Sequence, residues 1–192
     1  MKKLLFLFYS AIFTVMIACN SGPKDAKELA DSVNNTKDTA TTANNIITVN
    51  EKEAEFATNA ADAGITEISM ANLAISKTGN KEITDFANMM LKDHGAANDE
   101  LIALARSKNI TLPTTMSKEN QNRRNDLAEK TGSDFDKKYV DMMEKDHVKV
   151  LAFMEHEAMK GTDPDLKAFA SKMMPVINSH INAIRKIKNN LK

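Results

Sequence analysis

The sequence predicts an all-α fold, an up-down-up-down bundle of four long helices with a short extra helix between the second and third. Between residues 51 and 192, apolar residues recur at helical spacing, and no stretch shows the sustained alternation of a strand. Two short links rich in Gly and Asn or Pro divide this region and favour antiparallel helix pairs. Its length, about 140 residues, is that of one domain.

The first long helix is predicted over residues 51–77. Its apolar arc comprises Phe56, Ala60, Ala63, Gly64, Met70, Ala71 and Ala74. The opposite, solvent-facing side comprises Asp62, Thr66, Ser69 and Lys77. Glu67 falls in the middle of the apolar arc, where a carboxylate is costly unless it is paired.

The second long helix, residues 80–107, follows the link Thr78-Gly79-Asn80. Its apolar stripe comprises Ile83, Phe86, Ala87, Met90, Ala97, Leu101 and Leu104. His94 lies inside this stripe and Asp93 on its border. The connection that follows contains Pro113 and a short helix over residues 120–130, with Ser117 as its N-cap and Gly132 as its stop.

The third long helix is predicted over residues 134–160. Its apolar face comprises Phe135, Tyr139, Met142, Met143, Val150, Phe153 and Met154. Asp146 and His147 flank the centre of this face, Glu144 lies on its edge, and His156 points to the polar side.

The fourth long helix, residues 164–190, begins at Pro164, a residue suited to a first helical turn. Its stripe comprises Leu166, Phe169, Ala170, Met173, Ile177, Ile181, Ile184 and Ile187. His180 lies inside the stripe, and Pro175 predicts a kink or a loosened turn shortly before it.

Three histidines end related segments. Residues 86–94 (FANMMLKDH) nearly repeat as residues 139–147 (YVDMMEKDH), and residues 169–174 (FASKMM) echo them six residues before His180. If both antiparallel pairs turn at the same end, a rise of 1.5 Å per residue places His94, His147 and His180 about 21, 20 and 24 Å from that end, with Glu67 at about 15 Å. The sequence therefore predicts that three imidazoles and one carboxylate meet in the core.

This constellation is a candidate metal site with His94, His147, His180 and Glu67 as ligands. Such a set suits zinc, iron or manganese. Methionine pairs in the repeated segments add copper as a less favoured choice, because methionine is also ordinary core filler. Candidate partners that fix the imidazole tautomers are Asp93, Asp146 and Glu144. The same groups could instead form a metal-free hydrogen-bond network that sets the register of the helices.

No reaction can be assigned from the sequence. It contains no Gly-rich phosphate loop, nucleophile elbow or His-Glu-x-x-His pair. Glu144-x-x-His147 is a single Glu-x-x-His element, whereas a di-iron carboxylate site needs two, and Leu91 and Ile177 stand at the other positions. A non-enzymatic role is therefore favoured, and a redox or hydrolytic enzyme would require an open coordination position.

The N-terminus is typical of an exported protein. Residues 1–18 have two lysines and then an apolar run, shorter than the ~20 residues of a membrane span. Residues 16–19 (MIAC) resemble a bacterial lipoprotein signal box, so acylation of Cys19 is favoured over simple cleavage with a free thiol. Because Cys19 is the chain's one cysteine, the folded part would then lack disulfides and thiolate sites.

Residues 19–50 are predicted to be a disordered tether, because Ser, Thr, Asn, Asp and Lys dominate residues 22–50. Loss of Lys2 and Lys3 from the 26 basic residues leaves 24 against 26 acidic ones, a formal charge of −2. Such a balance gives no electrostatic footprint for nucleic acid. We expect a membrane partner through the lipid, at the outer membrane, facing the periplasm or the cell surface.

The landmarks together resemble a bacterial family, domain of unknown function 4142. The matching residues are Ala63-Gly64-x-x-Glu67 with Leu73-Ala74, Phe86-Ala87-x-x-Met90-x-x-Asp93-His94, Phe135-Asp136-x-x-Tyr139 before His147, and Leu166-x-x-Phe169-Ala170 before Pro175 and His180. Met174 stands where the family usually has leucine. The resemblance covers residues 51–190 and implies a ferritin-like bundle in an envelope protein, often a lipoprotein. It implies no activity, because the role of that family is unassigned.

Overall fold

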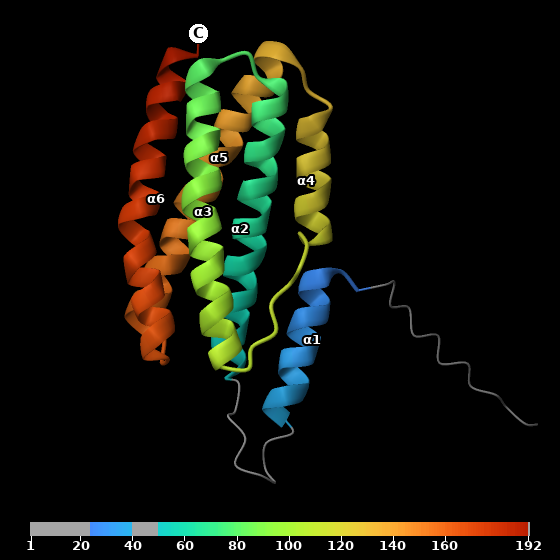
Figure 1. The fold of residues 1–192 in the computed structure, drawn as a ribbon, viewed down its shortest axis with the longest axis vertical. Helices are drawn as coiled ribbons and strands as arrows, with labels where there is room; N and C mark the ends of the chain where they lie inside the picture. Colours follow the sequence, from blue (N-terminus) through green and yellow to red (C-terminus); the bar gives the residue numbers. More distant parts are fainter. Residues whose placement is uncertain (1–23, 40–49, 192) are drawn as a thin grey trace, which may run out of the picture.

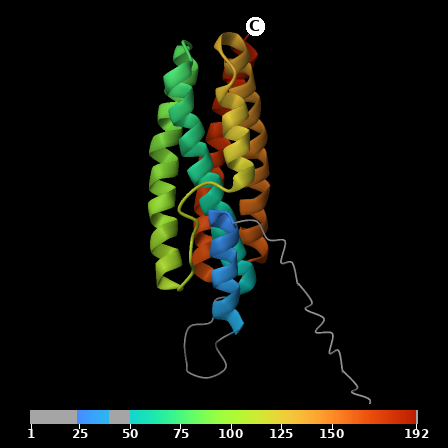
Figure 2. The ribbon, with the colours of Figure 1, turned by 90° about the vertical axis from the view of Figure 1, so that its right-hand side faces the viewer.

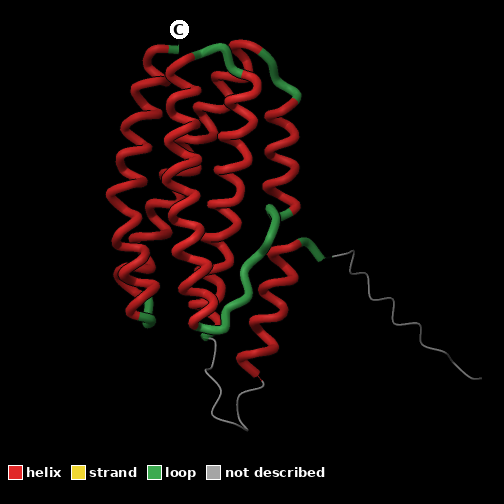
Figure 3. Tube along the Cα trace, in the orientation of Figure 1, coloured by secondary structure: helices red, strands yellow, loops and turns green. Residues whose placement is uncertain are grey.

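The computed structural model describes residues 24–39 and 50–191, and this part of the chain is all-helical (Figure 3). Its elements are α1 (Ala26–Thr39), α2 (Glu51–Lys77), α3 (Lys81–Ser107), α4 (Lys118–Ala128), α5 (Gly132–Lys160) and α6 (Pro164–Asn190). None of the described helices is both long and apolar enough to span a membrane. The predicted signal segment, residues 1–18, and Cys19 lie outside the described residues.

The predicted helix boundaries follow from local capping. Asn50, Asn80, Ser117 and Asp163 each accept a hydrogen bond from a backbone N–H of the first turn of α2, α3, α4 and α6, respectively. Gly132 differs from the prediction. It begins α5 with a φ of 54°, a conformation that glycine adopts without strain, while α4 already ends at Ala128.

Helices α2, α3, α5 and α6 lie side by side, and α4 runs along them beside α2 (Figures 1 and 2). The two closest packings are α2 against α3 and α5 against α6. Pro175 lies inside α6, which the structure assigns as one helix from Pro164 to Asn190. The four long helices thus form two helical hairpins packed against each other.

The two hairpins turn at opposite ends of the molecule, which corrects the predicted topology. At one end, Thr78 Oγ1 after α2 donates to Asp136 Oδ1 in the first turns of α5, 2.7 Å away. At the other end, Lys108 after α3 donates to Asp163 and Asp165 at the start of α6, over 2.5 and 2.8 Å. The up-down-up-down order is therefore wrong. Because residues 108–131 return along the molecule through α4, α3 and α5 run in the same direction (Figure 1).

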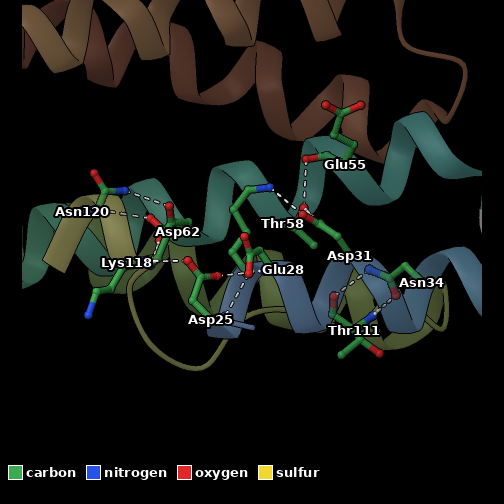
Figure 4. Close-up of polar contacts among 12 residues, drawn as sticks. Asp25, Glu28, Asp31, Asn34, Glu55, Thr58, Asp62, Thr111, Lys118 and Asn120 are labelled. Carbon is green, nitrogen blue, oxygen red and sulfur yellow. Dashed lines mark hydrogen bonds and ion pairs between the residues drawn. The ribbon is translucent and has the colours of Figure 1, made fainter. Parts of the chain in front are cut away.

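The side of α2 predicted to face solvent is partly covered. Asp62 and Thr66 are 6% and 3% exposed. Asp62 accepts hydrogen bonds from the Ser117 backbone N–H at 2.7 Å and from Asn120 Nδ2 at 2.8 Å. The returning connection, which a single-helix pattern does not reveal, therefore buries this face and bonds its polar groups (Figure 4).

Helix α1 occupies part of the predicted tether. Its buried residues are Ala30 and Asn34, so it contributes little to an apolar core. Polar contacts hold it instead: Asn34 exchanges two hydrogen bonds with the Thr111 backbone, at 2.8 and 2.9 Å, and Asp31 accepts one from Thr58 Oγ1 at 2.6 Å (Figure 4). The folded unit therefore begins before residue 51. The polar side chains that suggested disorder in the sequence make the hydrogen bonds that dock α1.

The apolar core consists of two clusters. The upper cluster, on the side of the α2–α3 turn, includes Met70, Phe86, Met90, Phe135, Tyr139, Met143 and Ile184. The lower cluster, on the side of the α5–α6 turn, includes Phe56, Leu101, Met154, Leu166, Phe169, Ile177 and Ile181. On α2, α3 and α5, the residues between the two clusters include Glu67, His94 and His147, respectively. Polar side chains thus form a layer across the core.

Candidate metal centre

The three predicted histidines meet in this layer, each from a different helix. Their ring centroids are 5.8 Å apart for His94 and His147, 5.3 Å for His94 and His180, and 5.3 Å for His147 and His180. One nitrogen from each ring lies within 4.8 Å of the others. Zinc–nitrogen bonds of about 2.0–2.1 Å in tetrahedral geometry would hold such nitrogens about 3.3 Å apart. Each nitrogen would therefore move by roughly 1 Å toward the ion on binding.

One nitrogen of each ring has a protein partner. Nδ1 of His147 donates to the Met143 carbonyl at 2.8 Å, one turn earlier in α5. Nε2 of His180 lies 3.0 Å from Asp93 Oδ2, and Nδ1 of His94 lies 3.1 Å from Glu67 Oε2. An acceptor at this position favours the tautomer with the ring proton on the partnered nitrogen.

The other nitrogen of each ring has none. His94 Nε2, His147 Nε2 and His180 Nδ1 are buried and have no hydrogen-bond partner among the described residues. With the proton held on the opposite nitrogen, each of these atoms presents a lone pair. Three buried lone pairs on converging rings are the arrangement that a metal ion satisfies.

Burial keeps two of the rings neutral at physiological pH. Burial lowers the pKa of His94 below 6.5, against the opposing charge of Glu67. Burial likewise lowers the pKa of His180, against its bond to Asp93. A metal ion binds the neutral form of imidazole. With these lowered pKa values, the rings need not release a proton before they bind an ion.

Glu67 reaches the layer but on the partnered side of the rings. Its carboxylate faces the Nδ1 atoms of His94 and His147, at 3.1 and 3.4 Å. The group of side chains close enough to share an ion contains the three histidines without Glu67. Glu67, predicted as a ligand, therefore lies outside this group, and its carboxylate faces imidazole nitrogens of α3 and α5.

Asp93, Asp146 and Glu144 were predicted to fix the imidazole tautomers. Asp93 contacts His180 of α6 rather than His94, its neighbour in the sequence. Asp146 instead binds Arg123 of α4 at 2.6 and 2.8 Å. Glu144 binds Arg185 and Lys188 of α6, each at 2.8 Å. Basic residues from other helices thus engage both carboxylates.

Sequence reasoning missed the Met143 carbonyl as the partner of His147. The signal was available, because a carbonyl four residues earlier lies within reach of a helical side chain. It also missed that the Tyr139 hydroxyl is buried with no hydrogen-bond partner in the described part of the chain. Burial, and then the charge of Glu67, raises the pKa of this tyrosine far above its ordinary value.

A small cavity adjoins the histidines on the side of the lower cluster. Its volume is about 40 Å³, and Glu67, Asp93, His94 and His180 lie on its wall. The apolar part of the wall includes Leu101, Met154, Phe169, Met173 and Ile177, and Asn98 adds a side-chain amide. A separate pocket of about 160 Å³ reaches Glu67 from the α4 side, past Arg123 and Asp146. The layer is therefore not fully enclosed by packed side chains.

Comparisons with known proteins give one match. No curated protein and no solved structure matches the chain. The family described as domain of unknown function (DUF4142) matches residues 37–187, which span α2 to α6 and the end of α1. The chain belongs to the family of domain of unknown function 4142.

Proposed function

We propose that this protein holds one transition-metal ion on His94, His147 and His180, in the core of a ferritin-like four-helix bundle. Two observations carry the proposal: three histidines bring one nitrogen each within 4.8 Å of one another, and each ring has one nitrogen beside a protein acceptor and another that is buried with no hydrogen-bond partner among the described residues. Metal-binding histidines show this division, because the outer bond fixes the tautomer that exposes the ligand nitrogen.

The metal-free network accounts for less of the geometry. It uses the contacts of Glu67, Asp93 and the Met143 carbonyl but leaves three ring nitrogens unbonded. A buried polar atom without a partner costs about 1–3 kcal/mol, so three of them are a considerable penalty for a purely structural core. One ion removes all three penalties.

The ferritin-like assignment is supported by the connectivity. The α2–α3 and α5–α6 hairpins are joined by one long crossover, so that α3 and α5 are parallel. This connectivity matches the single-crossover class of four-helix bundle. The site differs from a carboxylate-bridged di-iron centre, because the ligands are imidazoles. Three imidazoles suit zinc, iron or manganese, and copper is less favoured.

Metal analysis of the full chain, purified without chelator or affinity tag, tests the proposal. We expect about one ion per chain, and the variant H94A/H147A should retain less than about 0.1. The matched control is H156A, which removes the exposed histidine of α5 and should keep the metal. A parent protein below about 0.1 ion per chain after reconstitution with zinc, iron or manganese would refute the metal centre.

We further propose a lipid-anchored role at the cell envelope, in which Cys19 is acylated and holds the domain at the outer membrane. Support comes from the sequence, in the apolar run and the MIAC segment that ends at Cys19. Mass spectrometry of the membrane fraction tests this: the parent N-terminus should carry acyl chains on Cys19. A C19A variant that fractionates and weighs as the parent does would contradict it.

A further inference from the structure

We infer that the ion keeps one exchangeable coordination position, which opens into the 40 Å³ cavity and takes water or a ligand of two or three heavy atoms. This inference rests on the proposed metal centre and goes beyond it: a closed site would only stabilise the fold, whereas an open one binds a small molecule.

The histidine cluster supplies three protein donors. Structural zinc sites take four protein ligands, while three leave a position for an outside molecule. The nearby carboxylates have other partners: Glu67 faces the Nδ1 atoms, Asp93 bonds His180, and Asp146 binds Arg123. Within the described residues, the cluster offers three ligands and no fourth His, Cys, Asp or Glu.

The core differs on the two sides of the layer. Towards the upper cluster, the methionines Met70, Met90 and Met143 are completely buried. Towards the lower cluster, His94 and His180 border the cavity. Its volume of about 40 Å³ exceeds the roughly 10–15 Å³ that a cavity needs to hold one water molecule, but it does not admit a large ligand.

The wall of the cavity combines apolar and polar groups. Glu67 and Asp93 reach this wall, but their carboxylates already face imidazole nitrogens of the three histidines. Leu101, Met173 and Ile177 are apolar, and Asn98 adds a side-chain amide that can donate a hydrogen bond to a small molecule or anion held by the ion.

Cobalt(II) substitution of the full chain provides the assay, because its visible absorption reports the coordination of the ion. Azide, with three heavy atoms, should shift the cobalt bands in a saturable way. Imidazole, with five, should leave them unchanged, because the cavity is too small. The amount of bound cobalt is measured in the same samples.

Two variants change the cavity without touching a ligand. Ala97 lies on the cavity wall one turn after His94, and A97L should weaken azide binding at least tenfold with cobalt still bound. The matched control is A96L, the same change at the exposed neighbour, which should bind azide as the parent does. M173A enlarges the cavity and should let imidazole shift the spectrum.

The outcomes separate this inference from the metal centre. If the parent binds one cobalt but azide leaves its spectrum unchanged, the open position is refuted and the metal centre stands. Equal azide binding by A97L and A96L would refute the cavity as the site of the ligand. If no cobalt binds, the metal centre and this inference both fail. M173A keeps the test decisive should A97L not fold.

Discussion

Acid should destabilise the metal-free protein through the histidine layer. Burial lowers the folded-state pKa of His94 and His180 below 6.5, the value expected in the unfolded chain. As the pH falls through 6.5, the unfolded chain therefore binds protons that the folded protein does not. The stability that these neutral rings contribute is fully present above this pH and is lost below it.

The magnitude follows from proton linkage. Between pH 7.5 and 5.5, a histidine that titrates with a pKa of 6.5 when unfolded and has a lowered pKa when folded lowers the free energy of unfolding by at most about 1.4 kcal/mol. Two such rings give an upper bound of about 2.7 kcal/mol, a large fraction of the 5–15 kcal/mol typical of a domain.

Urea unfolding followed by circular dichroism, with chelator present, measures this loss at each pH. The variants H94Q and H180Q should each remove about half of the pH dependence, whatever their own stability. H156Q, at the exposed histidine, should keep all of it. A parent free energy that stays flat between pH 7.5 and 5.5, or a decline that persists in H94Q/H180Q, would refute the reasoning.

Three further substitutions test individual contacts. D93A should weaken zinc binding about 10–100-fold in a competition titration, because it frees His180 Nε2, while D146A should not, since Asp146 binds Arg123. Y139F should raise the free energy of unfolding by about 1 kcal/mol, because it removes a buried hydroxyl without a partner; a loss would show that the hydroxyl is bonded. E157Q should stabilise the protein on the order of 1 kcal/mol at neutral pH, because burial and the nearby Glu53 raise the pKa of this carboxyl. Thermal melts should show that gain shrinking in acid, as the parent carboxyl takes up a proton, and a gain that grows there would contradict it.

The meeting of the histidines was predictable although the direction of the helices was not. His94 and His147 each lie near the middle of their helix, so counting from either end puts them at nearly the same level. The residues that connect α3 to α5 are numerous enough for either direction. Hydrophobic periodicity says nothing about which path they take.

The repeated segment nevertheless carried directional information. Its first residues, Phe86 and Tyr139, meet with ring centroids 6.4 Å apart, and its last residues, His94 and His147, meet at 5.8 Å. Equivalent positions can face each other along the whole segment only when the two helices run in parallel. The near repeat of residues 86–94 in residues 139–147 thus indicated that α3 and α5 pack in parallel.

Contacts made by polar side chains across helices were the least predictable. Asp146 and Glu144 stand beside a histidine in sequence, but Arg123 and Arg185 come from other helices and bind them. Helix α1 docks in the same way, through Asn34 on Thr111. A one-dimensional pattern shows that such groups are polar, not which distant partner they find.

The three ligands come from both helical hairpins, and this has a mechanical consequence. His94 belongs to the α2–α3 hairpin, whereas His147 and His180 belong to the α5–α6 hairpin. An ion bound to all three would act as a cross-link between the two halves of the chain, and neither half alone holds three ligands. Removing it should loosen the docking of one hairpin on the other before either hairpin melts, so hydrogen exchange along the seam between them would report whether the metal is bound.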